Sequence, residues 1–411
     1  MARLKTTLTV ILALLAGASL ASAALVIART VETDRAQDQL TAFYTPPTEF
    51  DPTPGTLLRF ESLGVDTPGA TAYRILYVTT DGNDEPAVAS GMAFVPQASA
   101  ESTPRKVVAW THGTTGQGDA CAPSRSTNPI SQLTEFLPGA ITANWLVTAP
   151  DYLGLGTPGI QQYLLKEQEV RDTVNSVRAA QSLPDAQTGD TYAVFGHSQG
   201  GHTALWTGHL SEEVAPELNL VAVAAAAPAA ELRLIIEKQW RSVIGWVIGS
   251  EVMRSWPTNY PDLPVDSMMS RPAVLNYERM AQECITDAAL EGEIRQEIFN
   301  EDFFTADPAS EPLWSRALED QTPPPLPSDL PMMLIQGTAD QVVLAEPNAQ
   351  LQQDWCAAGS NINALWLGGI DHMKAAQVAG PSVVAWLADV FEGKPPANSC
   401  STPPPWSTLS N

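Results

Sequence analysis

The chain has 411 residues, 44% of them hydrophobic, which suffices for one large domain with an inserted subdomain or for two ordinary domains. Its 22 Lys and Arg stand against 46 Asp and Glu, giving a net charge of −24. Such a surface repels phosphate backbones and anionic lipid surfaces, so nucleic acid is excluded as a partner.

The first 23 residues have the layout of a cleavable secretory signal. Two cations, Arg3 and Lys5, precede a short apolar run that ends in the small residues ASA at 21–23. The alternative is an uncleaved membrane anchor, but the run is shorter than the roughly 20 residues that a spanning helix needs. The sequence therefore predicts export and cleavage near Ala23, with an extracellular or periplasmic mature chain.

Strand-length apolar runs follow in two patterns. Runs at 57–62, 73–79 and 86–95 come before any clear helix and predict an antiparallel start to a sheet. Later runs alternate with polar or helical segments such as 167–183, which indicates a mainly parallel sheet covered on both faces and hence an α/β protein. These later strands are predicted at 106–112, 144–150, 191–197, 220–228, 332–340 and 363–369.

One long stretch, 231–331, interrupts this alternation between two predicted core strands. We interpret it as a mostly helical cap inserted over the carboxyl ends of the strands, between core segments 24–230 and 332–411, the second of which ends in a Pro-rich tail. Most of its large side chains are expected to form the cap's own core, and only a few need face a substrate. They are Trp240, Trp246, Met253, Trp256, Tyr260, Met268, Met269, Phe299, Phe303, Phe304 and Trp314.

The strongest signal is GHSQG at 196–200, a G-x-S-x-G motif directly after the predicted strand 191–197 and directly before a helix-like stretch at 201–210. In a nucleophile elbow the serine has a strained backbone, and strand and helix pack too closely for a Cβ at the flanking positions, which explains the glycines. The motif in this setting predicts the α/β-hydrolase fold, with Ser198 as nucleophile.

A serine hydroxyl needs a positioned base to remove its proton. Of the five histidines, three lie beside the nucleophile or on the elbow helix, and His112 ends the first parallel strand. A base must approach Ser198 from the loop of another strand, which leaves His372, in the predicted loop after the last strand, as general base. The three excluded by position are His197, His202 and His209.

The acid of such a site falls between the serine and the histidine in chain order, at the carboxyl end of a strand. Asp340 ends the predicted strand 332–340 and is therefore expected to orient His372. Its rival is Asp371, but a side chain adjacent in sequence to His372 normally points away from it.

Negative charge on the substrate carbonyl oxygen must meet N–H donors that are already in place. One donor is expected to be the backbone amide of Gln199. The second should come from the THGTTG loop at 111–116, where Thr114 is our choice and Thr115 the competitor. His112 is expected to hold this loop by hydrogen bonding.

A further loop, APDYLGLG at 149–156, leaves the next strand beside the predicted site. Asp151 and Tyr152 either buttress the oxyanion loop or belong to an ordinary glycine-rich turn with a packed tyrosine. The sequence does not decide between the two.

Four cysteines in an exported chain indicate two disulfides, with three pairings that remain open. A bond between Cys356 and Cys400 would tie the Pro-rich tail to the body, and Cys121 with Cys284 would follow. None lies in a C-x-x-C or Cys/His cluster, so no metal or other cofactor is expected.

Several segments between residues 43 and 372 carry a resemblance to one family. They are FYTPP at 43–47, PGTLLR at 54–59, WTHGTTG at 110–116, DYLGLG at 151–156, GHSQGG at 196–201, GTAD at 337–340 and DH at 371–372. Together they resemble the secretory lipase family, the lipase-A type of secreted α/β-hydrolases.

The resemblance implies lipase or esterase activity on an ester or lipid substrate, and a helical cap that forms an acyl-binding channel. It supports Ser198, Asp340 and His372 as catalytic residues. It favours two disulfides, Cys121 with Cys284 and Cys356 with Cys400. We expect a monomer that touches a lipid interface transiently.

Other functions stay open beside a triacylglycerol lipase. A broad carboxylesterase or polyester hydrolase that prefers short acyl groups uses the same machinery, so only the acyl pocket separates the two. A prolyl-type peptidase uses the same triad. The fold also serves inactive binding proteins, which have usually lost the serine or the histidine, whereas both are present here.

Overall fold

The computed structural model describes residues 37–97 and 103–405, and the chain divides into two compact units, Met1–Thr45 and Pro46–Asn411. In the first unit, residues 37–44 are helical. The predicted signal segment 1–23 lies outside the described residues. Among the helices of the described ranges, none combines the length and the apolar character needed to cross a membrane.

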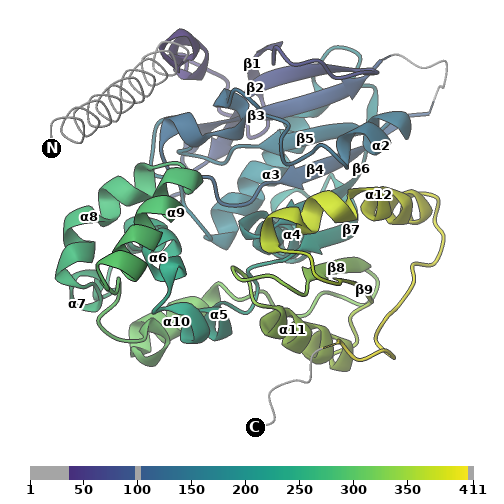
Figure 1. Cartoon of the computed structure of the whole chain (residues 1–411). Helices are drawn as coiled ribbons and strands as arrows, with labels where there is room; N and C mark the ends of the chain where they lie inside the picture. The colour runs from purple at the N-terminus through teal and green to yellow at the C-terminus, as the bar shows by residue number, and fades with distance from the viewer. Residues whose placement is uncertain (1–36, 98–102, 406–411) are drawn as a thin grey trace, which may run out of the picture. The chain divides into compact units, whose positions relative to one another are not determined.

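The described strands of the second unit form a nine-stranded sheet in the order β1-β2-β3-β5-β4-β6-β7-β8-β9 (Figure 1). Pairing is antiparallel from β1 through β3 to β5 and parallel from β5 to β9, which confirms the predicted sheet. The strands are β1 Leu57–Ser62, β2 Ala70–Thr80, β3 Pro86–Pro96, β4 Arg105–Thr111, β5 Leu146–Pro150, β6 Thr188–His197, β7 Asn219–Ala226, β8 Met332–Gly337 and β9 Ile362–Leu367.

The central strands are mostly buried because helices cover both faces of the sheet. Every residue of β5 and of β8 is buried, as expected from their largely apolar sequences. One face packs against α3 Lys166–Gln181, α4 Gln199–Val214 and α11 Ala345–Ala357. The other face packs against α2 Leu137–Thr142 and α12 His372–Phe391.

Between β7 and β8 the chain forms a group of helices, green in Figure 1, with its own apolar core. Trp246, Trp256, Phe303 and Trp314 are fully buried in it, as expected for most of the large side chains of this stretch. Phe299 differs, since 62% of it is exposed. The helices are α5 Leu232–Gln239, α6 Val243–Ser255, η3 Trp256–Thr258, α7 Val265–Met268, α8 Arg271–Gln282, α9 Ile285–Glu293, the π-helical turn η4 Ile294–Ile298, η5 Pro308–Ser310 and α10 Pro312–Asp320.

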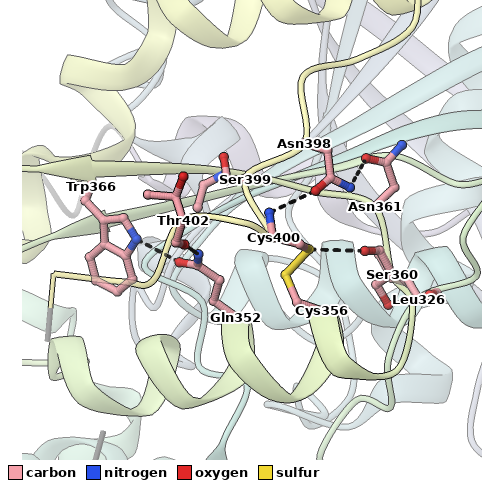
Figure 2. The surroundings of a disulfide bond; sticks show 11 residues. Leu326, Gln352, Cys356, Ser360, Asn361, Trp366, Asn398, Ser399, Cys400 and Thr402 are labelled. Atoms are coloured by element: carbon pink, nitrogen blue, oxygen red, sulfur yellow. Dashed lines mark hydrogen bonds between the residues drawn. A yellow bond between two sulfur atoms is a disulfide. The ribbon is translucent and has the colours of Figure 1, made fainter. Parts of the chain in front are cut away.

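A disulfide joins Cys356 at the end of α11 to Cys400 in the C-terminal segment (Figure 2). The chain around Cys400 also pairs with the edge strand, since Ser399 N donates to Ile362 O at 2.7 Å. Gln352 of α11 adds a further link by donating to Thr402 O at 3.1 Å. The bond closes a loop of 44 residues and holds the segment beyond α12 against the sheet.

Candidate active site

Ser198 lies at the turn between β6 and α4, where it is the N-cap residue of the helix. Its backbone has φ 56° and ψ −115°, a left-handed conformation that a residue with a Cβ adopts only under strain. Three hydrogen bonds hold the strained residue: its N–H donates to Ala226 O, and its carbonyl accepts from the N–H groups of His202 and Ala229. The serine is thus fixed at the carboxyl end of a central parallel strand.

Two glycines make this turn sterically feasible. A Cβ on Gly196 would lie 1.9 Å from Gly200 O, and a Cβ on Gly200 would lie 1.9 Å from Thr111 O. Backbone atoms cannot move aside as a flexible side chain can, so any other residue at either position would push β4, β6 and α4 apart. The G-x-S-x-G pattern is therefore explained by close backbone packing on both sides of the serine.

His372 and Asp340 contact each other although 32 residues separate them. His372 Nδ1 lies 2.8 Å from Asp340 Oδ2, and both side chains are buried. Asp340 Oδ1 accepts from the N–H groups of Val342 and Val343, each at 2.9 Å, and Oδ2 accepts from Gln336 Nε2 at 3.2 Å. These donors hold the carboxylate in place, so the carboxylate in turn fixes the orientation of the imidazole.

The surroundings of the histidine differ from the prediction in two details. The predicted strand 332–340 ends at Gly337, so Asp340 lies in the turn that follows β8. The placement of His372 in a loop is wrong, because it is the first residue of α12. Asp371, the rival acid, is the N-cap of that helix and accepts from Lys374 N at 3.1 Å. That bond satisfies a helix N-terminal amide and turns the carboxylate away from the imidazole.

His197 connects the elbow to His372, a role that reasoning from the sequence missed. Its Nε2 lies 2.9 Å from the backbone O of His372, and the two ring centroids are 4.7 Å apart. Burial, reinforced by the neighbouring His372 ring, lowers the pKa of His197 to about 3, so the ring is neutral at pH 7. Because a carbonyl only accepts, the single ring proton of His197 must lie on Nε2.

Ser198 itself follows His197 in sequence and is also buried. Within the described ranges, no hydrogen bond joins its hydroxyl to the ring of His372. In ligand-free sites such bonds are often long and shorten when substrate binds. The structure thus brings Asp340 and His372 into direct contact and places the serine next to the residue that holds His372.

The loop after β4 carries the other predicted oxyanion residue, Thr114. Its hydroxyl lies 2.8 Å from Tyr163 Oη. Neither the backbone amide of Thr114 nor that of Gln199 donates a hydrogen bond within the part of the chain that the structure describes. The competitor Thr115 is held by its carbonyl, which accepts from Ile285 N at 2.9 Å. Both predicted donors therefore retain a free N–H group.

The same loop is fastened to the helices inserted between β7 and β8. Gln117 N donates to Ala281 O at 2.7 Å, and a disulfide joins Cys121 to Cys284 just before α9. This pairing is the one that the family resemblance favours. It ties the loop of Thr114 to the inserted helices by a covalent bond across 163 residues of sequence.

Tyr152 and Asp151, on the loop after β5, touch the base of this loop. Tyr152 has φ 75° and packs its ring 4.6 Å from that of His112, and its hydroxyl donates to His112 O at 3.4 Å. His112 Nε2 also lies 3.3 Å from Asp151 O. Asp151 is buried, and its carboxylate accepts from Ser90 and Ser124, so it anchors the loop through its own neighbours.

The inserted helices enclose an apolar cavity of about 70 Å³. Residues of α5, α6 and α10 line it, together with Leu164 from the segment before α3. Leu164 N donates to Glu169 Oε1 at 3.0 Å, and the same oxygen accepts from Gln199 Nε2 at 2.7 Å. The wall of the cavity is therefore linked through one carboxylate to the residue that follows Ser198.

A strained serine between a parallel strand and a helix, on a mainly parallel sheet covered by helices, defines the α/β-hydrolase class. The family model described as Secretory lipase matches residues 125–399. The chain belongs to this family, and it is a carboxylic ester hydrolase of the lipase or esterase type.

Relatives of known name cover most of the chain. A secreted triacylglycerol lipase of Malassezia globosa is 25% identical over 87% of this chain and 82% of its own length. A probable inactive lipase of Mycobacterium tuberculosis is 22% identical over 86% and 82%. The structure of lipase A from Candida antarctica aligns with 89% of this chain and 88% of that one, at 18% identity and a TM-score of 0.68, a likeness of fold.

His197→Gln tests the neutral, buried imidazole. In the unfolded wild-type chain, His197 binds a proton below the ordinary histidine pKa of 6.5. In the native state it stays neutral down to about pH 3. The free energy of unfolding therefore decreases as the pH is lowered through that window, by up to about 1.4 kcal/mol per pH unit. We expect the free energy of unfolding of the variant, measured with urea, to depend less steeply on pH between pH 6 and 4, by up to that amount per pH unit.

The control is the same measurement at pH 8, where the wild-type imidazole is neutral in both states and a difference reports packing alone. Parallel stability curves for the two proteins from pH 8 to 4 would contradict the assignment.

Proposed function

We propose that this chain hydrolyses carboxylic esters through an acyl-enzyme on Ser198, with His372 as general base and Asp340 as the acid that orients it. The observation that most supports the proposal is the 2.8 Å contact between His372 Nδ1 and Asp340 Oδ2. His372 is also bonded through its backbone O to His197, the residue before a serine in strained elbow geometry. The free amides of Gln199 and Thr114 are the proposed oxyanion donors.

The chemistry follows from this arrangement. Asp340 accepts a hydrogen bond from the Nδ1–H group of His372, so His372 Nε2 has a lone pair that takes the proton of Ser198 as the serine oxygen attacks the ester carbonyl. The charge that develops on the carbonyl oxygen meets the amide of Gln199 at the N-terminus of α4. The imidazolium then protonates the departing alcohol, and water, activated by the same base, cleaves the acyl-enzyme.

Loss of a triad member should abolish turnover while leaving the fold intact. Ser198→Ala and His372→Ala are each expected to lower kcat on p-nitrophenyl butyrate by roughly 10⁴- to 10⁶-fold, and Asp340→Asn somewhat less. A fluorophosphonate probe should label the wild-type protein and not Ser198→Ala. The matched control is Ser211→Ala, a buried serine further along α4. Ester hydrolysis by Ser198→Ala above background would refute the proposal.

The apolar cavity is the proposed binding site of the acyl chain. Ile248 and Val252 of α6, Leu164 and Trp314 line it, and its lining offers an alkyl chain almost no polar atoms. Burial of methylene groups there is favourable at about 0.8 kcal/mol each. This lining supports an aliphatic acyl group, and the length of that group separates a triacylglycerol lipase from a broad carboxylesterase or polyester hydrolase that prefers short acyl groups.

Filling the cavity should shift acyl-length preference. Val252→Phe is expected to lower kcat/KM for p-nitrophenyl palmitate by about tenfold or more, with little change for the acetate, because the lost space is needed only by long chains. Ile236→Ala, which widens the same cavity, should raise kcat/KM for the palmitate relative to the acetate. A wild-type rate that collapses beyond butyrate would instead indicate a short-chain carboxylesterase.

An exposed apolar stripe on the inserted helices is the proposed contact with a lipid surface. Leu290, Ile294 and Ile298 recur every four residues along α9 and η4 and so share one face, with Phe299 directly after them. Leu290, Ile298 and Phe299 are each more than half exposed. The net charge of −24 opposes anionic lipids, so the surface we propose is that of a neutral ester or a zwitterionic bilayer.

The stripe predicts a difference between aggregated and dissolved substrates. The triple variant Leu290→Ser, Ile298→Ser, Phe299→Ser should lose most activity on emulsified triolein and keep that on dissolved p-nitrophenyl acetate, since only the former requires adsorption. Phe60→Ser, which removes an exposed aromatic ring on β1, is the control. Equal losses on both substrates, or a dimer in size-exclusion chromatography that the triple variant abolishes, would assign the stripe another role.

The domain organisation remains part of the proposal. We take 24–230 and 332–411 as the hydrolase core and 231–331 as the cap, with residues 1–23 removed on export near Ala23. The family and the two disulfides support an extracellular protein, because disulfides persist in oxidising compartments. We also propose that it acts as a monomer.

A further inference from the structure

Glu169, in the first turn of α3, is a fully buried carboxylate that the catalytic scheme above does not use. Oε1 accepts from Gln199 Nε2 at 2.7 Å and from Leu164 N at 3.0 Å. Oε2 accepts from Thr203 Oγ1 at 2.7 Å and lies 3.4 Å from His202 Nδ1. A carboxylate surrounded in this way by donors is held in one geometry and fixes its partners in turn.

One of these partners is the side chain of the residue whose amide is the first proposed oxyanion donor. Gln199 is the first residue of α4, and its side chain is buried. Its amide group bonds to Glu169, while Thr203 and His202, one turn further along the helix, bond to the other carboxylate oxygen. Glu169 therefore holds the first turn of the elbow helix at three positions.

Two routes lead from Glu169 to the loop that carries the second proposed donor, Thr114. Leu164 N bonds to the carboxylate, and the preceding residue, Tyr163, meets the hydroxyl of Thr114 at 2.8 Å. In the other route, Thr203 Oγ1 lies 3.4 Å from Tyr152 Oη, which donates to the backbone O of His112 at 3.4 Å. Both routes end on the loop after β4.

We propose that Glu169 is a positioning residue that holds the two halves of the oxyanion hole, the amides of Gln199 and Thr114, at a fixed separation. This inference rests on the proposed Ser198 mechanism. Its physical basis is that oxyanion donors act only when they are already in place, so an error of a fraction of an ångström weakens transition-state binding far more than substrate binding. The carboxylate contacts neither substrate nor reacting atoms.

Glu169→Gln is the test, because it keeps the shape of the side chain and replaces one acceptor oxygen by a donor that faces other donors. Loss of one oxyanion donor costs about 10² to 10³ in kcat. In Glu169→Gln both oxyanion donors remain but are displaced. We therefore expect kcat on dissolved p-nitrophenyl acetate to fall roughly 10- to 100-fold, with KM changed less than about threefold. The affinity for an alkylboronic acid, which mimics the tetrahedral intermediate, should fall in parallel with kcat.

Two variants of the same helix are controls. Glu167→Gln makes the same chemical change at an exposed position. Val174→Ala removes buried apolar volume from α3 and so destabilises the fold without touching the network. Both should retain kcat and boronate affinity at temperatures below their unfolding transitions.

Thr203→Val, a milder change than Glu169→Gln, should lower kcat about three- to tenfold because it removes one donor to Glu169 and one contact to Tyr152.

A double-mutant cycle with Gln199→Ala separates positioning from stability. If Glu169 acts through Gln199, the double variant should lose little more kcat than the worse single variant, whereas independent effects multiply. Losses of kcat that multiply would overturn the inference and leave the proposed function intact. The same would follow if the Glu169→Gln and Thr203→Val proteins matched Val174→Ala in kcat and boronate affinity. Retained hydrolysis by Ser198→Ala would overturn it together with the proposed function.

Discussion

The close approach of β4, β6 and the start of α4 is the constraint on which the rest of this site depends. Gly200 packs its Cα against the carbonyl of Thr111, and Gly196 against that of Gly200, at distances that leave no room for a side chain. The strand must therefore turn into the helix within a single residue, and that residue is Ser198 in a left-handed conformation. The turn places a free helix N-terminal amide, that of Gln199, directly beside the serine.

A second layer of contacts joins this turn to the inserted helices. The loop that carries Thr114 is bonded to the inserted segment through the carbonyl of Thr115 and through the disulfide between Cys121 and Cys284. The buried carboxylate of Glu169 bonds both to the elbow helix and to Leu164, which lines the apolar cavity. Because a buried carboxylate is costly unless its acceptors are satisfied, such a network favours one arrangement of its members.

Much of the fold could be predicted from local sequence pattern. Fully buried strands such as β5 and β8 appear as largely apolar runs, and each of the nine strands in the described part of the chain overlaps a predicted run. Strand and helix ends were less accurate. The run at 332–340 stops being a strand at Gly337, since the turn after β8 is shaped by hydrogen bonds to Asp340 that no periodicity reveals. His372 begins a helix because Asp371 caps it, which the prediction of a loop overlooked.

By itself the sequence determined the elbow, the alternation that produces a parallel sheet, and the long insertion before β8, because each depends on residues close together in the chain. Only the tertiary structure decided which carboxylate meets His372, which cysteines pair, and that His197 and Glu169 belong to the site. Those contacts join residues from 30 to 175 positions apart, and nothing in the local pattern around a buried glutamate or histidine specifies the partner that folding brings to it.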